Sequence, residues 1–133
     1  MLPFIDTHSV EIAASPETVF DLLERLGPQL GARGPMQIYT RLVGCEDRGA
    51  FHIARAERPH LLLLRGAHRF SRYELALRIE AGAATALHAD TCAEFPGLGG
   101  TAYRTIVISS GAHRIAMGQL LVLFKRRAER RQV

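Results

Sequence analysis

The sequence contains no tryptophan, two cysteines and no apolar segment that approaches the length of a membrane span. A spanning helix needs about 20 predominantly apolar residues, so we expect no stable membrane insertion. Cys45 and Cys92 form no Cys-x-x-Cys pair, and two thiols cannot complete a tetrahedral zinc site alone. No basic and apolar leader follows Met1, so we expect a cytoplasmic protein in which both thiols are reduced.

Lysine occurs once, whereas arginine is abundant, and the cationic excess is confined to one end of the chain. The last nine residues carry five basic side chains and one acid, and the preceding 124 residues carry twelve of each sign. Nucleic-acid binding needs a basic patch on the folded surface, so we expect no nucleic-acid partner. The segment Lys125–Arg131 either forms a solvated helix end or docks an acidic protein or a membrane surface through salt-sensitive contacts.

What remains is the composition of one globular domain over residues 1–133, with 47% apolar and 23% charged residues. Ser15-Pro16-Glu17 is typical of a helix start, and apolar residues at helical spacing continue to Leu26. Alternation with a period of two predicts strands, and apolar residues three and four apart predict a long final helix. The predicted strands are Phe4–Ala13, Gln37–Val43, Ala50–Ala56, Leu61–Arg65, Phe70–Ile79 and Thr85–Phe95, and the predicted helix is Thr101–Arg131.

Turn-like links join the last five strands, which favours antiparallel pairing of neighbours. One sheet and one long amphipathic helix bury both apolar faces if the sheet curls around the helix. We therefore predict an α+β domain, in which a curved antiparallel sheet of six to seven strands wraps around a long C-terminal helix. Gly111 weakens that helix by about 1 kcal/mol near its middle.

Four stretches of the sequence resemble the START, polyketide-cyclase and pollen-allergen superfamily, which has the helix-grip fold. They are Val10–Phe20, Glu57-Arg58-Pro59, Gly66–Phe70, and Glu94–Gly97 with Tyr103-Arg104. One departure is that six strands are predicted here, where the superfamily usually has seven. The resemblance implies a hydrophobic cavity between the sheet and the last helix, where members bind lipids, sterols, hormones or polyketides. Some members are cyclases and others are carriers, so the fold alone does not imply a reaction.

Alternation assigns one apolar face of each strand to the interior, with few polar groups among its residues, as in small-molecule pockets. The run Leu61–Leu64 can present either pair of leucines, of which we assign Leu61 and Leu63. Small residues on the predicted strand Thr85–Phe95 and on the last helix around Ser110 leave space for a ligand between sheet and helix, unless the phenylalanines and Met117 fill that space. The predicted lining residues are Phe51, Ile53, Arg55, Leu61, Leu63, Tyr73, Leu75, Leu77, Leu87, Ala89, Thr91, Tyr103, Ile106, Val107, Ser110, His113 and Met117.

Four of these residues carry polar groups that suit proton transfer or the orientation of a ligand. His113 lies on the inward stripe of the last helix, and histidine exchanges protons near neutral pH. Tyr73 and Tyr103 can orient a ligand carbonyl, and Arg55 can pair with a ligand carboxylate. Each of these residues can instead have a purely structural role. His113 can be a hydrogen-bonded histidine of the core, the tyrosines can belong to the rim of the core, and Arg55 can pair with Glu57.

No cofactor or metal is predicted. His88 and Asp90 share one strand face, but the alternation places them on the solvent side without a third ligand at a diagnostic spacing. The Gly97–Gly100 loop lacks a phosphate-binding fingerprint and fits a hinge into the last helix. The sequence thus favours binding of a hydrophobic or aromatic small molecule, with a lipid or polyketide-like ligand. The alternatives are a polyketide cyclase or dehydratase that uses His113 and Tyr73 for proton transfer, and a partner protein that acts through its basic tail. A homodimer is left open.

Overall fold

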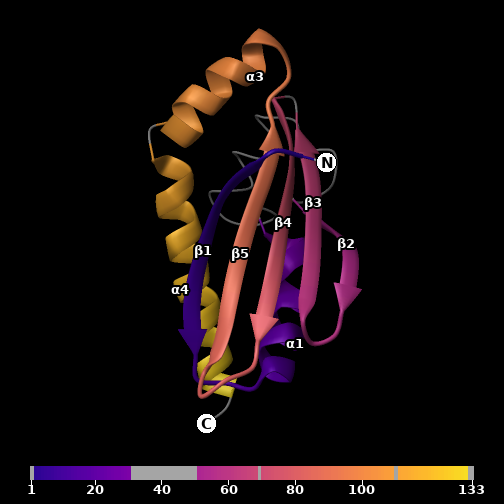
Figure 1. Ribbon diagram of the computed structural model, residues 1–133, viewed down its shortest axis with the longest axis vertical. Coiled ribbons are helices and arrows are strands. Elements are labelled where there is room, and N and C mark those ends of the chain that lie inside the picture. Colours follow the sequence, from indigo (N-terminus) through magenta and orange to yellow (C-terminus); the bar gives the residue numbers. More distant parts are fainter. Residues whose placement is uncertain (1, 31–50, 69, 110, 132–133) are drawn as a thin grey trace.

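The computed structural model describes residues 2–30, 51–68, 70–109 and 111–131. The predicted strand Gln37–Val43, Cys45 and Ser110 lie outside these ranges. Five strands form one antiparallel sheet in the order β1-β5-β4-β3-β2 (Figure 1). Their bounds are β1 Phe4–Ile12, β2 His52–Glu57, β3 Leu61–His68, β4 Ser71–Glu80 and β5 Thr85–Glu94. The helices are α1 Pro16–Leu26, η1 Gly27–Gln29, α3 Gly97–Arg104, η2 Thr105–Ser109 and α4 Ala112–Arg131.

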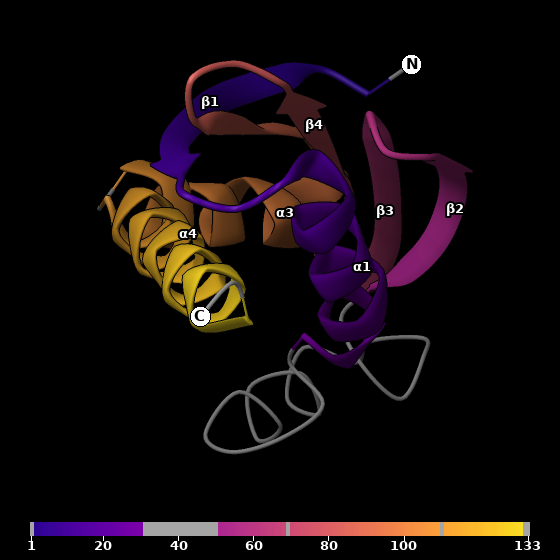
Figure 2. The same cartoon turned by 90° about the horizontal axis from the view of Figure 1, so that it is seen from below.

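The sheet is curved, and α1, α3 and α4 all lie on its concave side (Figure 2). This is the architecture expected of a helix-grip fold, and the predicted fold class is confirmed. Helix α1 begins where the sequence predicts, because the Ser15 hydroxyl accepts a hydrogen bond from the Thr18 amide at 3.2 Å and Pro16 occupies the first turn. Helix α4 runs along β1 and also packs against α1.

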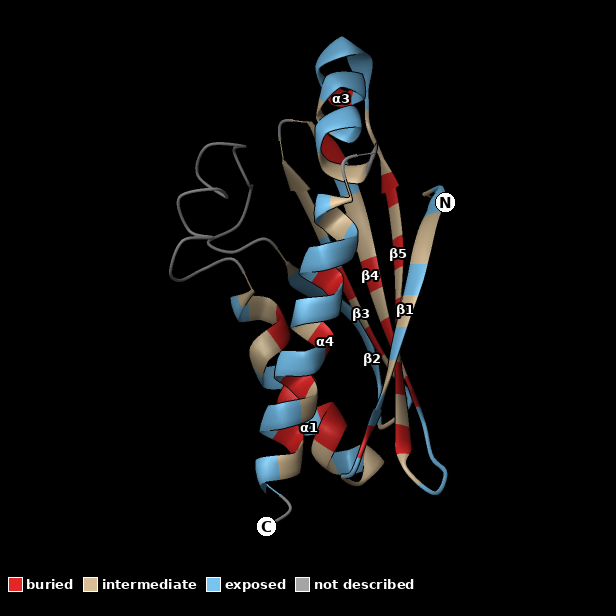
Figure 3. Cartoon of the chain, turned by 90° about the vertical axis from the view of Figure 1, so that its left-hand side faces the viewer, coloured by how far each residue is buried: buried red, intermediate tan, exposed pale blue. Residues whose placement is uncertain are grey.

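The core lies between the lower half of the sheet and the two helices α1 and α4. Strands β4 and β5 contribute alternate residues to it, so the predicted alternation is confirmed. Helix α4 contributes one buried stripe, whereas its opposite side is exposed (Figure 3). Burial of these apolar side chains is the main favourable term for folding. The α4 residues in the core are Met117, Leu121, Phe124 and Ala128.

In β3 the leucines that face the interior are Leu62 and Leu64, not the predicted pair Leu61 and Leu63. Leu62 and Leu64 are fully buried, because they lie across from Leu77 and Leu75 on the inward face of β4. The predicted inward positions of Leu61 and Leu63 are therefore wrong. Four consecutive leucines carry no alternation, so their own sequence cannot specify which pair faces inward.

The long final helix is broken, which corrects the prediction of one helix over Thr101–Arg131. Gly111 has φ of +83°, a left-handed conformation that ends helices and that glycine adopts without strain. Before it, η2 is a π-helix, which shifts the register of the side chains by one residue per turn. The segments 97–108 and 112–131 are bent by 58° relative to each other.

Within the described ranges, no single helix is long and apolar enough to cross a membrane. The two segments on either side of Gly111 satisfy that length and composition only when they are joined across their bend.

Replacement of Phe124 by alanine tests whether the buried stripe of α4 holds this helix on the sheet. Phe124 is fully buried, so its truncation should lower the free energy of unfolding by about 3–5 kcal/mol. Val122→Ala on the exposed side of the same helix is the matched control, with an expected change within about 0.5 kcal/mol. Urea unfolding followed by circular dichroism measures both. Equal losses from the two variants would show that α4 is oriented differently.

Candidate functional site

Four polar side chains gather on the concave face of the sheet above the apolar core: Asp6 and His8 of β1, Thr91 of β5 and His113 of α4. We call them the Asp6 cluster. Asp6 and His8 share the inward face of β1 with Val10 and Ile12, because β1 pairs Asp6 with Thr91 and His8 with Ala89. His113 reaches them from the first turn of α4.

Asp6 sits between the two histidines and contacts both. His8 Nε2 lies 3.2 Å from Asp6 Oδ2, and His113 Nε2 lies 3.3 Å from Asp6 Oδ1. The two imidazole rings meet edge to face, with their centroids 6.5 Å apart. All three side chains are at least 70% buried, so their contacts are only partly screened by water. A carboxylate that accepts from an imidazole fixes the orientation and tautomer of that ring.

A β-bulge lies next to Asp6 at the top of β1. Phe4 pairs with Cys92 and Asp6 with Thr91, so β1 uses two residues where β5 uses one, and Ile5 is the additional residue. Bulges bend a strand locally and redirect its side chains, and they are frequent beside functional sites. Here the bulge ends the regular pairing immediately above the Asp6 cluster.

The Thr91 hydroxyl is a buried polar group whose hydrogen-bonding capacity is unsatisfied among the described residues. Thr91 lies directly across from Asp6 on one side and from Leu75 on the other. The residue is 7% exposed, and its hydroxyl oxygen has no hydrogen-bond partner among the described residues. A buried hydroxyl without a partner costs about 1–3 kcal/mol, so such groups usually mark a bound water, a ligand or a functional role.

An aromatic cluster covers the upper end of the concave face, beyond Thr91. The Tyr103 ring of α3 stacks on Phe70 with centroids 5.6 Å apart and meets the His68 ring edge to face at 4.8 Å. Tyr73 in turn contacts the rings of His68 and Phe51. Tyr73 pairs with Ala93, two residues from Thr91 on the same face of β5. The aromatic cluster and the Asp6 cluster are thus neighbours. The members of the aromatic cluster are Phe51, His68, Phe70, Tyr73, Phe95 and Tyr103.

His68 is fixed in one neutral tautomer by its hydrogen bonds. Its Nδ1 accepts from the Phe70 amide at 3.0 Å and therefore carries no proton. Its Nε2 lies 2.9 Å from the Ser71 hydroxyl and holds the ring proton of the neutral form. Burial lowers the pKa of His68, because a half-buried imidazolium loses hydration.

Helix α3 docks on the aromatic cluster through glycines. A Cβ atom at Gly100 would lie 2.6 Å from the Phe95 carbonyl carbon, so only glycine fits there without displacement. A Cβ at Gly99 would contact the Phe70 ring at 3.5 Å. The predicted Gly97–Gly100 hinge is therefore the first turn of α3, and the missing side chains of Gly99 and Gly100 allow α3 to approach the sheet closely.

The structure brings most of the predicted lining residues to the concave face. Six of them are buried there: Leu75, Leu77, Leu87, Ala89, Thr91 and Met117. Five more are partly buried: Phe51, Tyr73, Tyr103, Val107 and His113. A cavity between the sheet and the helices, and a ligand role for these residues, remain predictions.

Three further predicted positions are exposed. Ile53 pairs with the inward-facing Leu64 and so lies on the concave side of the sheet, but it is 37% exposed because β2 is an edge strand. Arg55 is 63% exposed and pairs with Glu57, the alternative that the sequence left open. Ile106 is 69% exposed, because the π-helical turn rotates it away from the stripe that α4 buries. The inward assignments of Arg55 and Ile106 are wrong, and β2 is exposed at each of its six residues.

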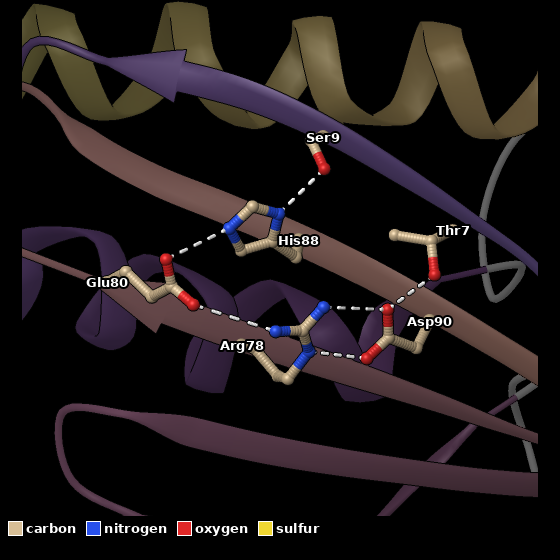
Figure 4. A network of polar contacts seen from close by, with 6 residues as sticks. All are labelled: Thr7, Ser9, Arg78, Glu80, His88 and Asp90. Atoms are coloured by element: carbon tan, nitrogen blue, oxygen red, sulfur yellow. Dashed lines mark hydrogen bonds and ion pairs between the residues drawn. The ribbon is translucent and has the colours of Figure 1, made fainter.

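The outer face of the sheet holds a separate polar network (Figure 4). Arg78 binds Asp90 through two nitrogens and also approaches Glu80, and Thr7 donates to Asp90 at 2.7 Å. These hydrogen bonds, above all those from Arg78, lower the pKa of Asp90. His88 contacts Ser9 at 2.7 Å and Glu80 at 3.3 Å. The predicted solvent-side position of His88 and Asp90 is confirmed.

Asp6, His8 and His68 are not among the site residues predicted from the sequence. For Asp6 and His8 a signal exists, because they alternate in register with the apolar residues Val10 and Ile12 of the same strand. Polar residues on the apolar face of a strand indicate a buried polar site. His68 follows Gly66 and Ala67, where the alternation is too weak to assign a face.

Solved structures share this fold. A conserved protein from Geobacillus kaustophilus matches with a TM-score of 0.59 and 14% identity over 93% of this chain and 94% of that protein. DynU16, from the dynemicin biosynthetic locus, matches with a TM-score of 0.51 and 17% identity over 93% of this chain. This chain spans 45% of the length of DynU16. Cgl2372 from Corynebacterium glutamicum, described as Polyketide_cyc-like, has 16% identity over 97% of this chain and 94% of that protein, with a TM-score of 0.47.

Neither a protein-family model nor a curated protein matches the sequence. The solved structures therefore establish the fold of the chain and not its ligand or activity. With the curved sheet and the C-terminal helix on its concave side, the Geobacillus kaustophilus protein and DynU16 confirm the helix-grip fold that the sequence resemblance implied.

The pH dependence of stability tests the state of His68. Because the folded protein favours the neutral ring, the unfolded chain binds more protons below the ordinary pKa of 6.5. Stability should therefore fall as the pH drops from about 7.5 to about 5. His68→Gln offers a donor and an acceptor without titrating, so its stability should change less over this range. The pKa of Asp90 is lowered, so the stability that Asp90 contributes is lost only below about pH 5, under the range in which His68 titrates. Urea unfolding at each pH measures both proteins, and parallel curves would contradict the assignment.

Proposed function

We propose that this protein binds a small, largely apolar or aromatic molecule on the upper concave face of the sheet. The apolar part of the ligand contacts the aromatic cluster, and one polar group of the ligand meets the Asp6 cluster. The unsatisfied Thr91 hydroxyl is the observation that carries this proposal. Thr91 is the member of the Asp6 cluster that lies next to the aromatic cluster. Among the described residues its hydroxyl lacks the partner that a ligand hydroxyl or carbonyl provides.

The distribution of polar groups supports a ligand site of this type. The lower concave face is filled by apolar side chains of α1 and α4. The upper face combines aromatic rings with a carboxylate, two imidazoles and a hydroxyl. Small-molecule sites have this composition, with mostly apolar walls and a few polar groups that orient the ligand. The bend at Gly111 places α3 over this end of the sheet rather than in line with α4 (Figure 1).

A lipid or polyketide-like ligand and a cytoplasmic location belong to the same proposal. Its support is chemical, because rings such as Tyr73 and Phe51 bind planar or aliphatic carbon surfaces equally well. The predicted absence of a nucleic-acid partner is compatible with the outer face of the sheet, where Arg65, Arg72 and Arg78 are already paired with carboxylates.

Replacement of Thr91 by valine separates a ligand role from a structural one. Valine keeps the shape of threonine and removes the unsatisfied hydroxyl, so the free energy of unfolding should rise by about 1 kcal/mol. Ligand affinity should fall, because the ligand loses its hydrogen bond. The measurements are urea unfolding, and native mass spectrometry of gently purified wild type and variant for a retained small molecule. Thr85→Val is the matched control, since its hydroxyl donates to the Ala14 carbonyl and its loss should be destabilising.

An enzymatic function is the second candidate, and the contact between His113 and Asp6 favours it. A carboxylate that orients an imidazole is the arrangement used for general acid–base catalysis. Tyr73, on the neighbouring part of the face, is the second predicted proton-transfer group. In this candidate the protein cyclises or dehydrates a polyketide-like substrate, and His113 exchanges a proton with it.

His113→Asn tests the enzymatic candidate. If His113 transfers a proton, the variant should lose about 100-fold or more in the rate of water loss from a poly-β-ketone thioester, as followed by mass spectrometry. His60→Asn, at an exposed position outside the site, should keep the wild-type rate. If both variants keep the wild-type rate, or if the wild type does not react, the enzymatic candidate is contradicted and the binding function alone is retained. A substrate that fits the cavity but is not turned over should still be displaced more easily from the Thr91→Val variant.

A further inference from the structure

The outward side of α4 carries a groove of about 660 Å³ that the ligand site does not use. The groove lies between two rows of side chains that each advance four residues at a time. One row runs from Arg114 through Gly118 and Val122 to Arg130, and the other runs from Ile115 to Leu123. Such rows are the ridges between which a second helix packs. From Arg114 to Arg130 the groove is about 24 Å long, which is the length of a contact between two helices.

Aliphatic side chains line the middle of this groove and remain exposed. Ile115 is 64%, Val122 is 42% and Leu123 is 39% exposed. Helix α4 thus buries one stripe in the core and leaves a second apolar stripe on its opposite side (Figure 3). Between them, Gly118 leaves a gap in the ridge, since a Cβ built there meets nothing within 4 Å. A gap of this kind allows a partner helix to approach the α4 backbone closely.

The charges around the groove are of one sign. Arg114, Arg126 and Arg130 line it, and no acidic side chain does. Elsewhere the arginines of the sheet are paired, as Arg65 is with Glu74 and Arg78 with Asp90. In contrast, none of the five arginines of α4 has an ion-pair partner within the described ranges. The one acid of α4, Glu129, already binds Lys125 and the Ala13 amide.

We propose that this groove docks an amphipathic helix of another protein, with apolar residues at helical spacing and acidic residues along both sides. The apolar residues of the partner fill the gap at Gly118, and its carboxylates pair with the arginines. A second copy of this chain does not fit. Its own α4 would oppose arginine to arginine, and its acidic α1 buries its apolar side and already pairs Asp21 and Glu24 with Arg58.

The geometry also distinguishes a helix from a membrane surface. A helix that lies in a membrane surface carries its apolar residues on one side and its charges on the other, whereas the outward side of α4 intersperses exposed aliphatic side chains with arginines along one shallow groove. A ridge of helical side chains is the complementary convex shape. The docking surface is independent of the proposed ligand site, since its residues lie on the side of α4 opposite to Met117, Leu121 and Phe124.

A pair of adjacent arginines provides the test. Arg126 lines the groove, and Arg127 is exposed on the same helix outside it. Arg126→Glu and Arg127→Glu change the net charge equally. The probe is a fluorescein-labelled helical peptide of about 20 residues, with leucines at helical spacing and flanking glutamates, titrated by fluorescence anisotropy. Arg126→Glu should weaken binding about tenfold, and Arg127→Glu by at most about twofold.

Gly118→Leu is the second variant, and it separates docking from folding. Leucine favours a helix more than glycine does and has free space at this position, so the Tm should rise while peptide binding is lost. The proposal is overturned if wild type does not bind the peptide, if Gly118→Leu binds it fully, or if the two charge reversals act equally. Equal binding of a peptide with lysines in place of the glutamates would also overturn it. So would binding to phosphatidylserine vesicles that both charge reversals weaken alike, since this would indicate a membrane partner.

Discussion

Burial of the concave face of the sheet under α4 is the constraint on which the other features depend. The sheet has one apolar face, and without a cover that face would expose the alternate leucines and isoleucines of β3, β4 and β5 to water. Helix α1 is short and covers one end, so α4 supplies much of the remaining cover through a stripe centred on Phe124. This packing fixes the rotation of α4 about its axis. That rotation in turn directs His113 toward Asp6 and directs the arginine-lined groove outward.

The interior consists of two regions with different chemistry. The lower region is closed by apolar packing that includes the fully buried rings of Phe20 and Phe124. Among the described residues, the upper region contains a carboxylate between two imidazoles, a hydroxyl without a hydrogen-bond partner, and the six rings of the aromatic cluster. Polar groups in such a place lower stability unless they are paired. Their concentration at one end, next to a β-bulge and a helix break, is the pattern expected where function outweighs stability.

The sequence predicted the elements whose patterns repeat over many residues. The alternation in Thr85–Glu94 is unbroken over ten residues, and every inward position it assigned is buried. Prediction from alternation failed where neighbouring residues are all apolar and therefore do not distinguish the two faces of a strand. The run Leu61–Leu64 is apolar at each position, so only its pairing with β4 determines which leucines face inward. The exposed position of Ile106 depends on a π-helical turn, which an apolar spacing of three and four cannot indicate. Asp6 and His8 were predictable in principle, because they follow the period of Val10 and Ile12, but the site they form needs His113, 105 residues further along the chain from His8.

Gly111, in its left-handed conformation between η2 and α4, divides the C-terminal part of the chain into two helical segments that are held by different contacts. Helix α4 is held by the core, whereas α3 is attached to the upper end of the sheet through its glycines and the aromatic cluster. Because the break at Gly111 lies between these two attachments, the position of α3 over the aromatic cluster and the packing of Phe124 in the core rest on separate contacts.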